Sequence, residues 1–87
     1  MTNFIHSRDY FENGNVVRLN CDTQCNFMLL DDTNFRYYQG GQSCKYFGGH
    51  YKTFPAKIAV PSSGYWNVVI DLGGGSANIK YAIDVLK

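Results

Sequence analysis

Residues 60–72, VPSSGYWNVVIDL, constrain the fold more than any other part of the chain. The segment opens with turn residues, and a strongly apolar run follows them directly. Successive side chains of a strand point to opposite faces. One face therefore carries Trp66, Val68, Ile70 and Leu72, with no polar residue. The other face carries Asn67, Val69 and Asp71. This pattern predicts a central strand with one fully buried face and a half-buried back, onto which the rest of the chain packs.

Shorter apolar or alternating segments predict the other strands. They lie at residues 3–11, 16–21, 27–30, 43–47, 55–60 and 77–86. The dipeptide Asn13-Gly14, a strong hairpin signal, forms the turn between the first two. The run at 27–30 has no polar residue, which is typical of a strand buried on both faces. Residues 3–11 alternate only loosely and are expected at an edge.

Capping and turn residues separate the remaining segments of the chain. Residues 31–34 offer helix-capping side chains, so residues 35–39 are predicted to form one helical turn that ends at 40–41. The pair Gly48-Gly49 is expected to end the strand at 43–47, and Gly73-Gly74-Gly75 the central strand. The chain, residues 1–87, is therefore predicted to be a single all-β domain. Its architecture would be a small antiparallel β-sandwich or partly open barrel of six to seven strands, with at most one short helical turn.

Composition narrows the choice of partner and compartment. A chain of 87 residues has a modest core, and its seven Tyr, six Phe and one Trp exceed what that core can enclose. Exposed rings then indicate a ligand site or an oligomer interface, for example in a homodimer. The net charge of +1 argues against a dedicated nucleic-acid or membrane binder. Three cysteines, no signal peptide and no membrane-spanning stretch favour the cytoplasm.

A series of residues spread along the chain resembles a known family. The series is Asn34-Phe35, Tyr46-Phe47-Gly48-Gly49-His50, Pro55, Ile58, Val60-Pro61, Gly64, Trp66, Val68 and Asp71-Leu72-Gly73-Gly74. It looks like the domain of unknown function 1883 family, over nearly the whole chain. Members are small, mostly β domains of bacteria, alone or joined to other domains, including Toll/interleukin-receptor-like ones. The resemblance implies this fold and a signalling or immune context, and it brings no established activity.

The segment KYFGGHYK is the candidate ligand site. Its residues are Lys45, Tyr46, Gly48, Gly49, His50, Tyr51 and Lys52. The glycines let a backbone approach a ligand closely and leave amides for an anion, while the basic side chains supply charge and the tyrosines stack on a flat ring. The competing interpretation is structural, because glycine pairs in β domains usually form turns or bulges. The secondary candidates are Arg36, Tyr37 and Tyr38.

No arrangement typical of a catalytic, cofactor or metal site is visible in the sequence. Gly73-Gly74-Gly75 lacks the lysine and the following helix of a phosphate loop. The cysteines form no Cys-x-x-Cys pair, so inert thiols are favoured over zinc ligands. Glu12 is the single glutamate, and the acids show no acid/base pair. We therefore predict no enzymatic activity, no cofactor and no metal.

Three hypotheses for function follow. The first is a non-catalytic interaction module whose aromatic, basic middle segment binds a protein partner or a ligand. The second is a receptor for an anionic small molecule, such as a nucleotide-derived signal, with Lys45, His50 and Lys52 on the phosphate. The acid-free interval between Asp32 and Asp71 points weakly to such a partner. The third is single-stranded nucleic acid binding by the same residues, with an affinity that falls steeply with salt. The low net charge argues against it.

Overall fold

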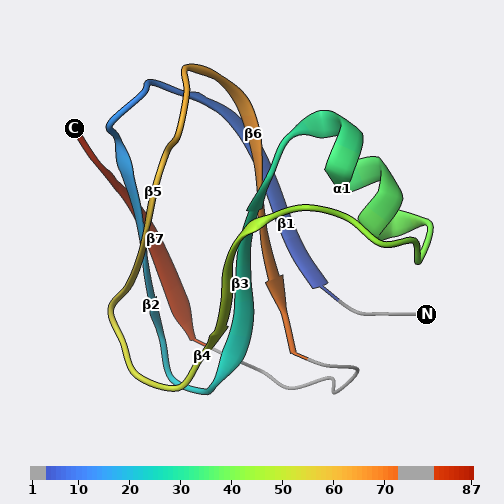
Figure 1. Ribbon diagram of the computed structural model, residues 1–87. Helices are drawn as coiled ribbons and strands as arrows, with labels where there is room; N and C mark the ends of the chain where they lie inside the picture. Colours follow the sequence, from blue (N-terminus) through green and yellow to red (C-terminus); the bar gives the residue numbers. More distant parts are fainter. Residues whose placement is uncertain (1–3, 73–79) are drawn as a thin grey trace.

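The computed structural model describes residues 4–72 and 80–87 (Figure 1). Within them, seven strands and one helix follow in the order β1 (Phe4–Phe11), β2 (Val16–Cys21), β3 (Cys25–Leu30), α1 (Asp32–Gln39), β4 (Phe47–Tyr51), β5 (Ala56–Ala59), β6 (Gly64–Asp71) and β7 (Tyr81–Leu86). All neighbouring strands are antiparallel. They form a four-stranded sheet, β1-β6-β3-β4, and a three-stranded sheet, β5-β2-β7. This confirms the predicted mostly β sandwich, and the barrel alternative is not realised.

The main core lies between the two sheets. β2 alternates as predicted, with the side chains of Val17 and Leu19 fully buried. They pack with Phe27 and Leu29 of β3 and with Ile58 of β5. Each such side chain contributes about 1.5–3 kcal/mol to folding through the hydrophobic effect. β3 is buried on both faces, as predicted, because one face meets this core and the other lies under α1.

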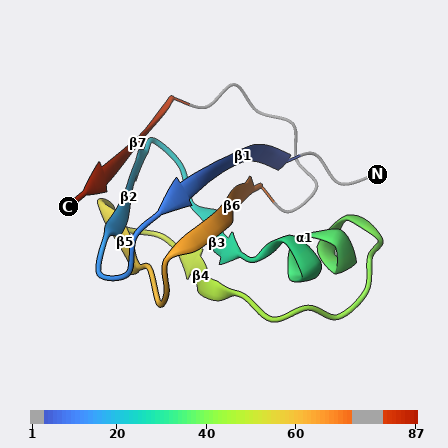
Figure 2. The same cartoon turned by 90° about the horizontal axis from the view of Figure 1, so that it is seen from above.

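β6 is the central strand that the sequence indicates, and it lies between β1 and β3. Its apolar face, with Trp66, Val68 and Ile70, belongs to the main core. The prediction of a half-buried back is wrong, since Asn67 is 1% exposed and Asp71 is 8% exposed. α1 covers this face, and Figure 2 shows the helix on the side of the four-stranded sheet that faces away from the other sheet. Phe35 of the helix packs there on Val69.

α1 begins with the predicted cap. The Asp31 side chain accepts a hydrogen bond from the backbone N–H of Asn34 at 2.7 Å. The helix then starts at Asp32, three residues before the single turn predicted at 35–39, and ends as expected at Gly40. Among the described residues no helix is long and apolar enough to cross a membrane.

The turn at Asn13-Gly14 is present, but it does not make a hairpin. β1 pairs with β6 over its whole length, from Phe4 opposite Asp71 to Phe11 opposite Gly64. β2 pairs with β5 and β7 in the other sheet. The turn therefore carries the chain from one sheet to the other. β1 is an edge strand, as predicted. Its pairing with the buried β6 replaces the β1–β2 hairpin that the local Asn13-Gly14 signal predicts.

The strand predicted at 43–47 is displaced along the chain. The observed β4 starts at Phe47 and contains Gly48 and Gly49, so the prediction that the glycines end a strand is wrong. Gly48 has φ +114°, and a Cβ there would lie 2.2 Å from the carbonyl oxygen of Phe27. The glycine thus lets β4 approach β3 closely. The predicted Gly73-Gly74-Gly75 connection and residues 77–79 of the predicted last strand lie outside the described residues.

Candidate functional site

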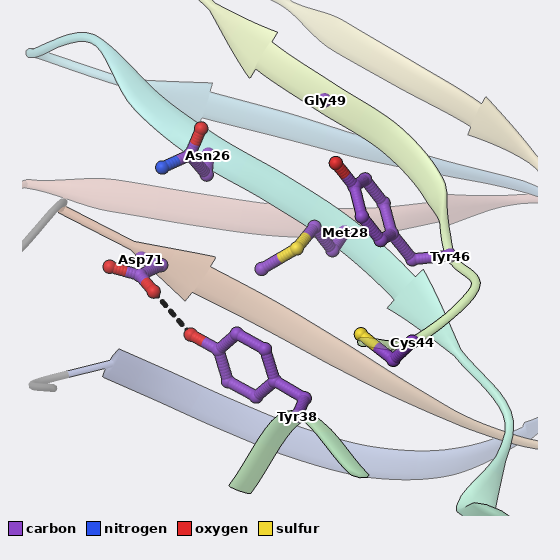
Figure 3. A pocket seen from close by; sticks show the side chains of 7 residues that line it. All are labelled: Asn26, Met28, Tyr38, Cys44, Tyr46, Gly49 and Asp71. Carbon is purple, nitrogen blue, oxygen red and sulfur yellow. Dashed lines mark hydrogen bonds between the residues drawn. The ribbon is translucent and has the colours of Figure 1, made fainter. Parts of the chain in front are cut away.

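A pocket of about 260 Å³ lies on the outer face of the four-stranded sheet, beside α1 (Figure 3). Its lining residues are Asn26, Met28, Tyr38, Cys44, Tyr46, Gly49 and Asp71. They come from β3, α1, the segment between α1 and β4, β4 itself, and the end of β6. Figure 3 shows the Met28 side chain between the two tyrosine rings. The pocket is thus a meeting point of elements that are distant in sequence.

The most buried polar contact of this pocket joins α1 to β6. The hydroxyl of Tyr38 donates a hydrogen bond to Oδ2 of Asp71, drawn as the dashed line in Figure 3. Burial raises the pKa of Tyr38 above its ordinary value, and the hydrogen bond to Asp71 and its negative charge raise this pKa further. The phenol is therefore a stable hydrogen-bond donor, and the carboxylate is the negative charge of the pocket.

Two side-chain contacts hold the other walls in place. Asn26 is the cross-strand partner of Asp71, so the two side chains share the outer face of the sheet. The Oδ1 atom of Asn26 lies 3.2 Å from Nδ1 of His50, which donates to it because an amide oxygen can only accept. On the other side, the backbone N–H of Lys45 donates to Oδ1 of Asn34 at 2.9 Å. This bond ties the segment that carries Tyr46 to the helix.

The candidate segment 45–52 is divided between this pocket and other places. Tyr46, 47% exposed, and Gly49 line the pocket. The side chains of Lys45, His50 and Lys52 are exposed and are not among its lining residues.

The other residues of the segment have structural surroundings. Tyr51 packs against Phe27 of the main core, with ring centroids 5.9 Å apart. Gly48 is required by the close approach of β4 to β3. A Cβ at Gly49, by contrast, would meet no heavy atom of the described residues within 4 Å, and Gly49 lines the pocket. The structural interpretation therefore fits Gly48, and the ligand-site interpretation of Gly49 stays a prediction.

The secondary candidates are likewise divided. Tyr38 lines the pocket, whereas Arg36 and Tyr37 are exposed and do not. Four lining residues were missed in the sequence as site residues, namely Asn26, Met28, Cys44 and Asp71. A usable signal existed for one of them. Asp71 is a charged residue at the end of the most apolar strand, and aspartates are rarely buried unless their carboxylate is paired.

A second polar network fixes α1 on the sheet. Nδ2 of Asn67 donates to the carbonyl oxygen of Leu30 at 3.2 Å and to Oδ1 of Asp32 at 2.8 Å. Oδ1 of Asn67 accepts from Nε2 of His6 at 2.8 Å, and the imidazole stacks on Phe35 at 4.0 Å. This network lies at the opposite end of α1 from Tyr38. It holds the helix, and with it one wall of the pocket.

An ion pair between Arg8 and Asp32 forms the surface end of this polar network. Nε and Nη2 of Arg8 donate to the two carboxylate oxygens of Asp32 at 2.9 and 2.8 Å. The hydrogen bonds from Arg8 and Asn67 hold the pKa of Asp32 well below its usual range. The guanidinium also lies 4.3 Å from the ring centroid of Tyr65. No local sequence pattern indicates this arrangement, because its partners are far apart along the chain.

Comparison with known families decides what kind of domain this is. The profile of DUF1883, a domain of unknown function, matches residues 2–87. The chain belongs to this family. The resemblance noted in the sequence is thereby confirmed. No curated protein and no solved structure matched the chain.

The three cysteines of this DUF1883 domain are free thiols. Burial raises the pKa of Cys25 to about 11, with a further contribution from the neighbouring Cys21. Such a thiol is protonated at neutral pH, which makes it a poor nucleophile and metal ligand. Within residues 4–72 and 80–87, no three His, Cys, Asp or Glu side chains come together as a metal site.

Proposed function

We propose that this DUF1883 domain is a non-catalytic binding module and that the outer pocket holds its ligand. The observation that carries the proposal is the convergence of five chain segments on one pocket, with the buried Asp71 and Tyr38 at its polar side. Most of these groups stand on strands and a helix, which hold binding residues more firmly than loops do. A pocket with a few convergent polar groups and an apolar floor is the usual form of a ligand site.

The size of the pocket limits what it accepts. Its volume of about 260 Å³ is at or below the lower end of the roughly 300–1,000 Å³ typical of sites for drug-sized ligands. A small molecule, or one side chain of a protein partner, would fill it. A cytoplasmic role in bacterial signalling or immunity is part of the proposal. It is supported by the free thiols and by what the family resemblance implies.

The alternatives that require an anionic ligand have less support. No lysine, arginine or histidine is among the described residues that line the pocket, and the basic residues of segment 45–52 lie outside it. A nucleotide phosphate or a nucleic acid backbone would face Asp71 there. A homodimer stays a prediction.

Blocking the pocket tests the proposed function. Gly49→Leu would place a side chain in open space, so the variant should fold with its pocket filled. Ala59→Leu, at an exposed position of β5, adds the same side chain elsewhere and is the matched control. We expect small polar fragments to shift the backbone amide NMR signals of Asn26, Tyr46 and Asp71 in the wild type and in the control, and to leave them unchanged in Gly49→Leu. Fragment-induced shifts that persist in Gly49→Leu, or that gather on another surface, would contradict the proposal.

A further inference from the structure

The outer strands of the two sheets differ in how their free edges are protected. These strands are β1, β4, β5 and β7. Edge strands invite pairing with another chain, and proteins usually protect them with charged side chains or proline. β1 carries Arg8 and Asp9, and Oδ1 of Asp9 accepts the backbone N–H of Tyr10. β5 carries Lys57, and β7 carries Asp84. β4, with the sequence FGGHY, carries no proline and no Asp, Glu, Lys or Arg.

The backbone of β4 is accessible along this edge. Figure 2 shows β4 at the margin of its sheet, beyond β3, and Phe47, Gly48 and His50 are exposed. Within residues 4–72 and 80–87, no backbone hydrogen bond links β4 to any segment other than β3. In a strand that is paired on one side only, alternate N–H and C=O groups point outward. The glycine pair has no side chains to cover these groups, as is typical where another backbone approaches closely.

Lysines at both ends of β4 indicate the charge of a partner. Lys45 precedes the strand and Lys52 follows it, and both side chains are exposed. Neither lysine forms an ion pair with a described residue, because the ion pairs found there belong to arginines. Residues 1–3 and 73–79 contain no Asp or Glu. Acidic side chains at the ends of an added strand would therefore meet positive charge that is not already paired.

An exposed aromatic ring lies toward each side of the sheet at this edge. Tyr46 lines the pocket on the outer face, and Phe47 packs on Trp66 of the main core, with ring centroids 6.0 Å apart. Both Tyr46 and Phe47 are 47% exposed. The side chains of an added strand alternate between the two faces, so apolar side chains of that strand would find a ring on either face.

We propose that the free edge of β4 binds an extended, acidic segment of a partner protein, which adds a strand to the four-stranded sheet. In this mode of recognition, main-chain hydrogen bonds supply affinity and the neighbouring side chains supply specificity. The lysines at the two ends and the two exposed rings are the specifying groups. The inference goes beyond the proposed function, because it concerns the edge of β4 and does not depend on the pocket holding a ligand.

Two peptides with blocked ends test the charge of the partner. Acetyl-Glu-Val-Thr-Val-Thr-Val-Glu-amide is the probe, and acetyl-Lys-Val-Thr-Val-Thr-Val-Lys-amide is the control of opposite charge. Each is titrated at equal ionic strength, with amide NMR shifts and hydrogen exchange as readouts. We expect the acidic peptide to shift the amides of β4 and to slow the exchange of those that point outward, and the basic peptide to do neither. Equal binding of the two peptides, or shifts that gather on another strand, would overturn the inference.

Paired lysine substitutions test the two ends of β4. Lys45→Gln/Lys52→Gln removes two exposed ion pairs with the acidic peptide and should weaken its binding by about two- to thirtyfold. Lys80→Gln/Lys87→Gln is the matched control, because these lysines stand at the two ends of β7, another edge strand. All four lysines are exposed, so both variants should fold, and the control should keep its affinity. An equal loss in both variants, or no loss in either, would overturn the role of the β4 lysines.

Backbone N-methylation of the acidic peptide tests strand addition itself. One version carries N-methyl groups on its odd-numbered residues, and the other carries them on its even-numbered residues. A strand added to an edge turns only one of these two rows of N–H groups toward its neighbour. We expect one version to lose binding and the other to keep it, whereas equal binding of both would show that no strand is added. These outcomes leave the proposed function untouched, because that proposal depends on fragment-induced shifts in the pocket.

Discussion

The substitution Asn67→Leu tests whether a buried amide holds α1 on the sheet. Leucine has the same number of side-chain heavy atoms as asparagine and the same branch at Cγ, so the change removes the hydrogen bonds and keeps the branched shape of the side chain. The variant loses all three hydrogen bonds of Asn67, in a position that is 1% exposed. Two are neutral, to the Leu30 carbonyl and to His6, and the third goes to the solvent-exposed carboxylate of Asp32. At about 0.5–1.5 kcal/mol for each neutral hydrogen bond, we expect the free energy of unfolding to fall by about 1–3 kcal/mol. For a domain of this size, the middle of that range lowers Tm by roughly 8–16 °C.

Urea unfolding followed by tryptophan fluorescence measures this loss. Trp66 is the only tryptophan of the chain and is 7% exposed, so its emission reports the loss of the main core. Asn20→Leu, at an exposed position of β2, is the matched control and should change stability by less than about 0.5 kcal/mol. A neutral or stabilising Asn67→Leu would refute the reasoning. It would show that the apolar contacts of Phe35 hold the helix without help from the amide.

Two further predictions concern the thiol of β3 and the glycines of β4. Because the pKa of Cys25 is raised to about 11, the folded state binds its proton more tightly than the unfolded state does, so stability is complete below an ordinary thiol pKa of about 8.5 and falls as the pH rises through 11. Urea midpoints between pH 8 and 11 should show this fall, and Cys25→Ala should flatten it; an equal slope in both proteins would contradict the assignment. Gly48→Ala should destabilise strongly, because its Cβ would overlap a carbonyl oxygen, whereas Gly49→Ala should leave the urea midpoint nearly unchanged. Equal effects of the two substitutions would contradict the different surroundings described for them.

The core faces could be predicted because they depend on local alternation. Val17 and Leu19 of β2, and Trp66 and Val68 of β6, are buried where a period of two residues places them. The back of β6 follows a different rule. Asn67 and Asp71 look like residues of a solvent-facing surface, and they are buried because α1, more than 30 residues earlier in the chain, covers them. No pattern within β6 could indicate that cover.

The residues of the pocket show the same limit of local sequence patterns. The sequence indicates Tyr46 and Gly49 because the segment around them is rich in glycine, aromatic and basic residues, and it includes Tyr38 only as part of the secondary candidate segment 36–38. The sequence does not indicate Asn26 and Asp71 as site residues, since only the pairing of β3 with β6 places them opposite each other. Strand pairing is non-local information. A sequence that alternates well specifies which side of a strand is buried, but it does not specify the neighbouring strand.

Gly48 and Gly49 show why adjacent identical residues need separate explanations. At Gly48 a positive φ brings the backbone of β4 so close to β3 that any side chain would collide with the carbonyl of Phe27. At Gly49 no described residue lies within 4 Å of an added Cβ, and the glycine lines the pocket. The first glycine is needed to form the sheet, and the second is needed only if the pocket binds something. A Gly49→Leu variant that folds normally but no longer responds to ligand would therefore separate stability from function within one dipeptide.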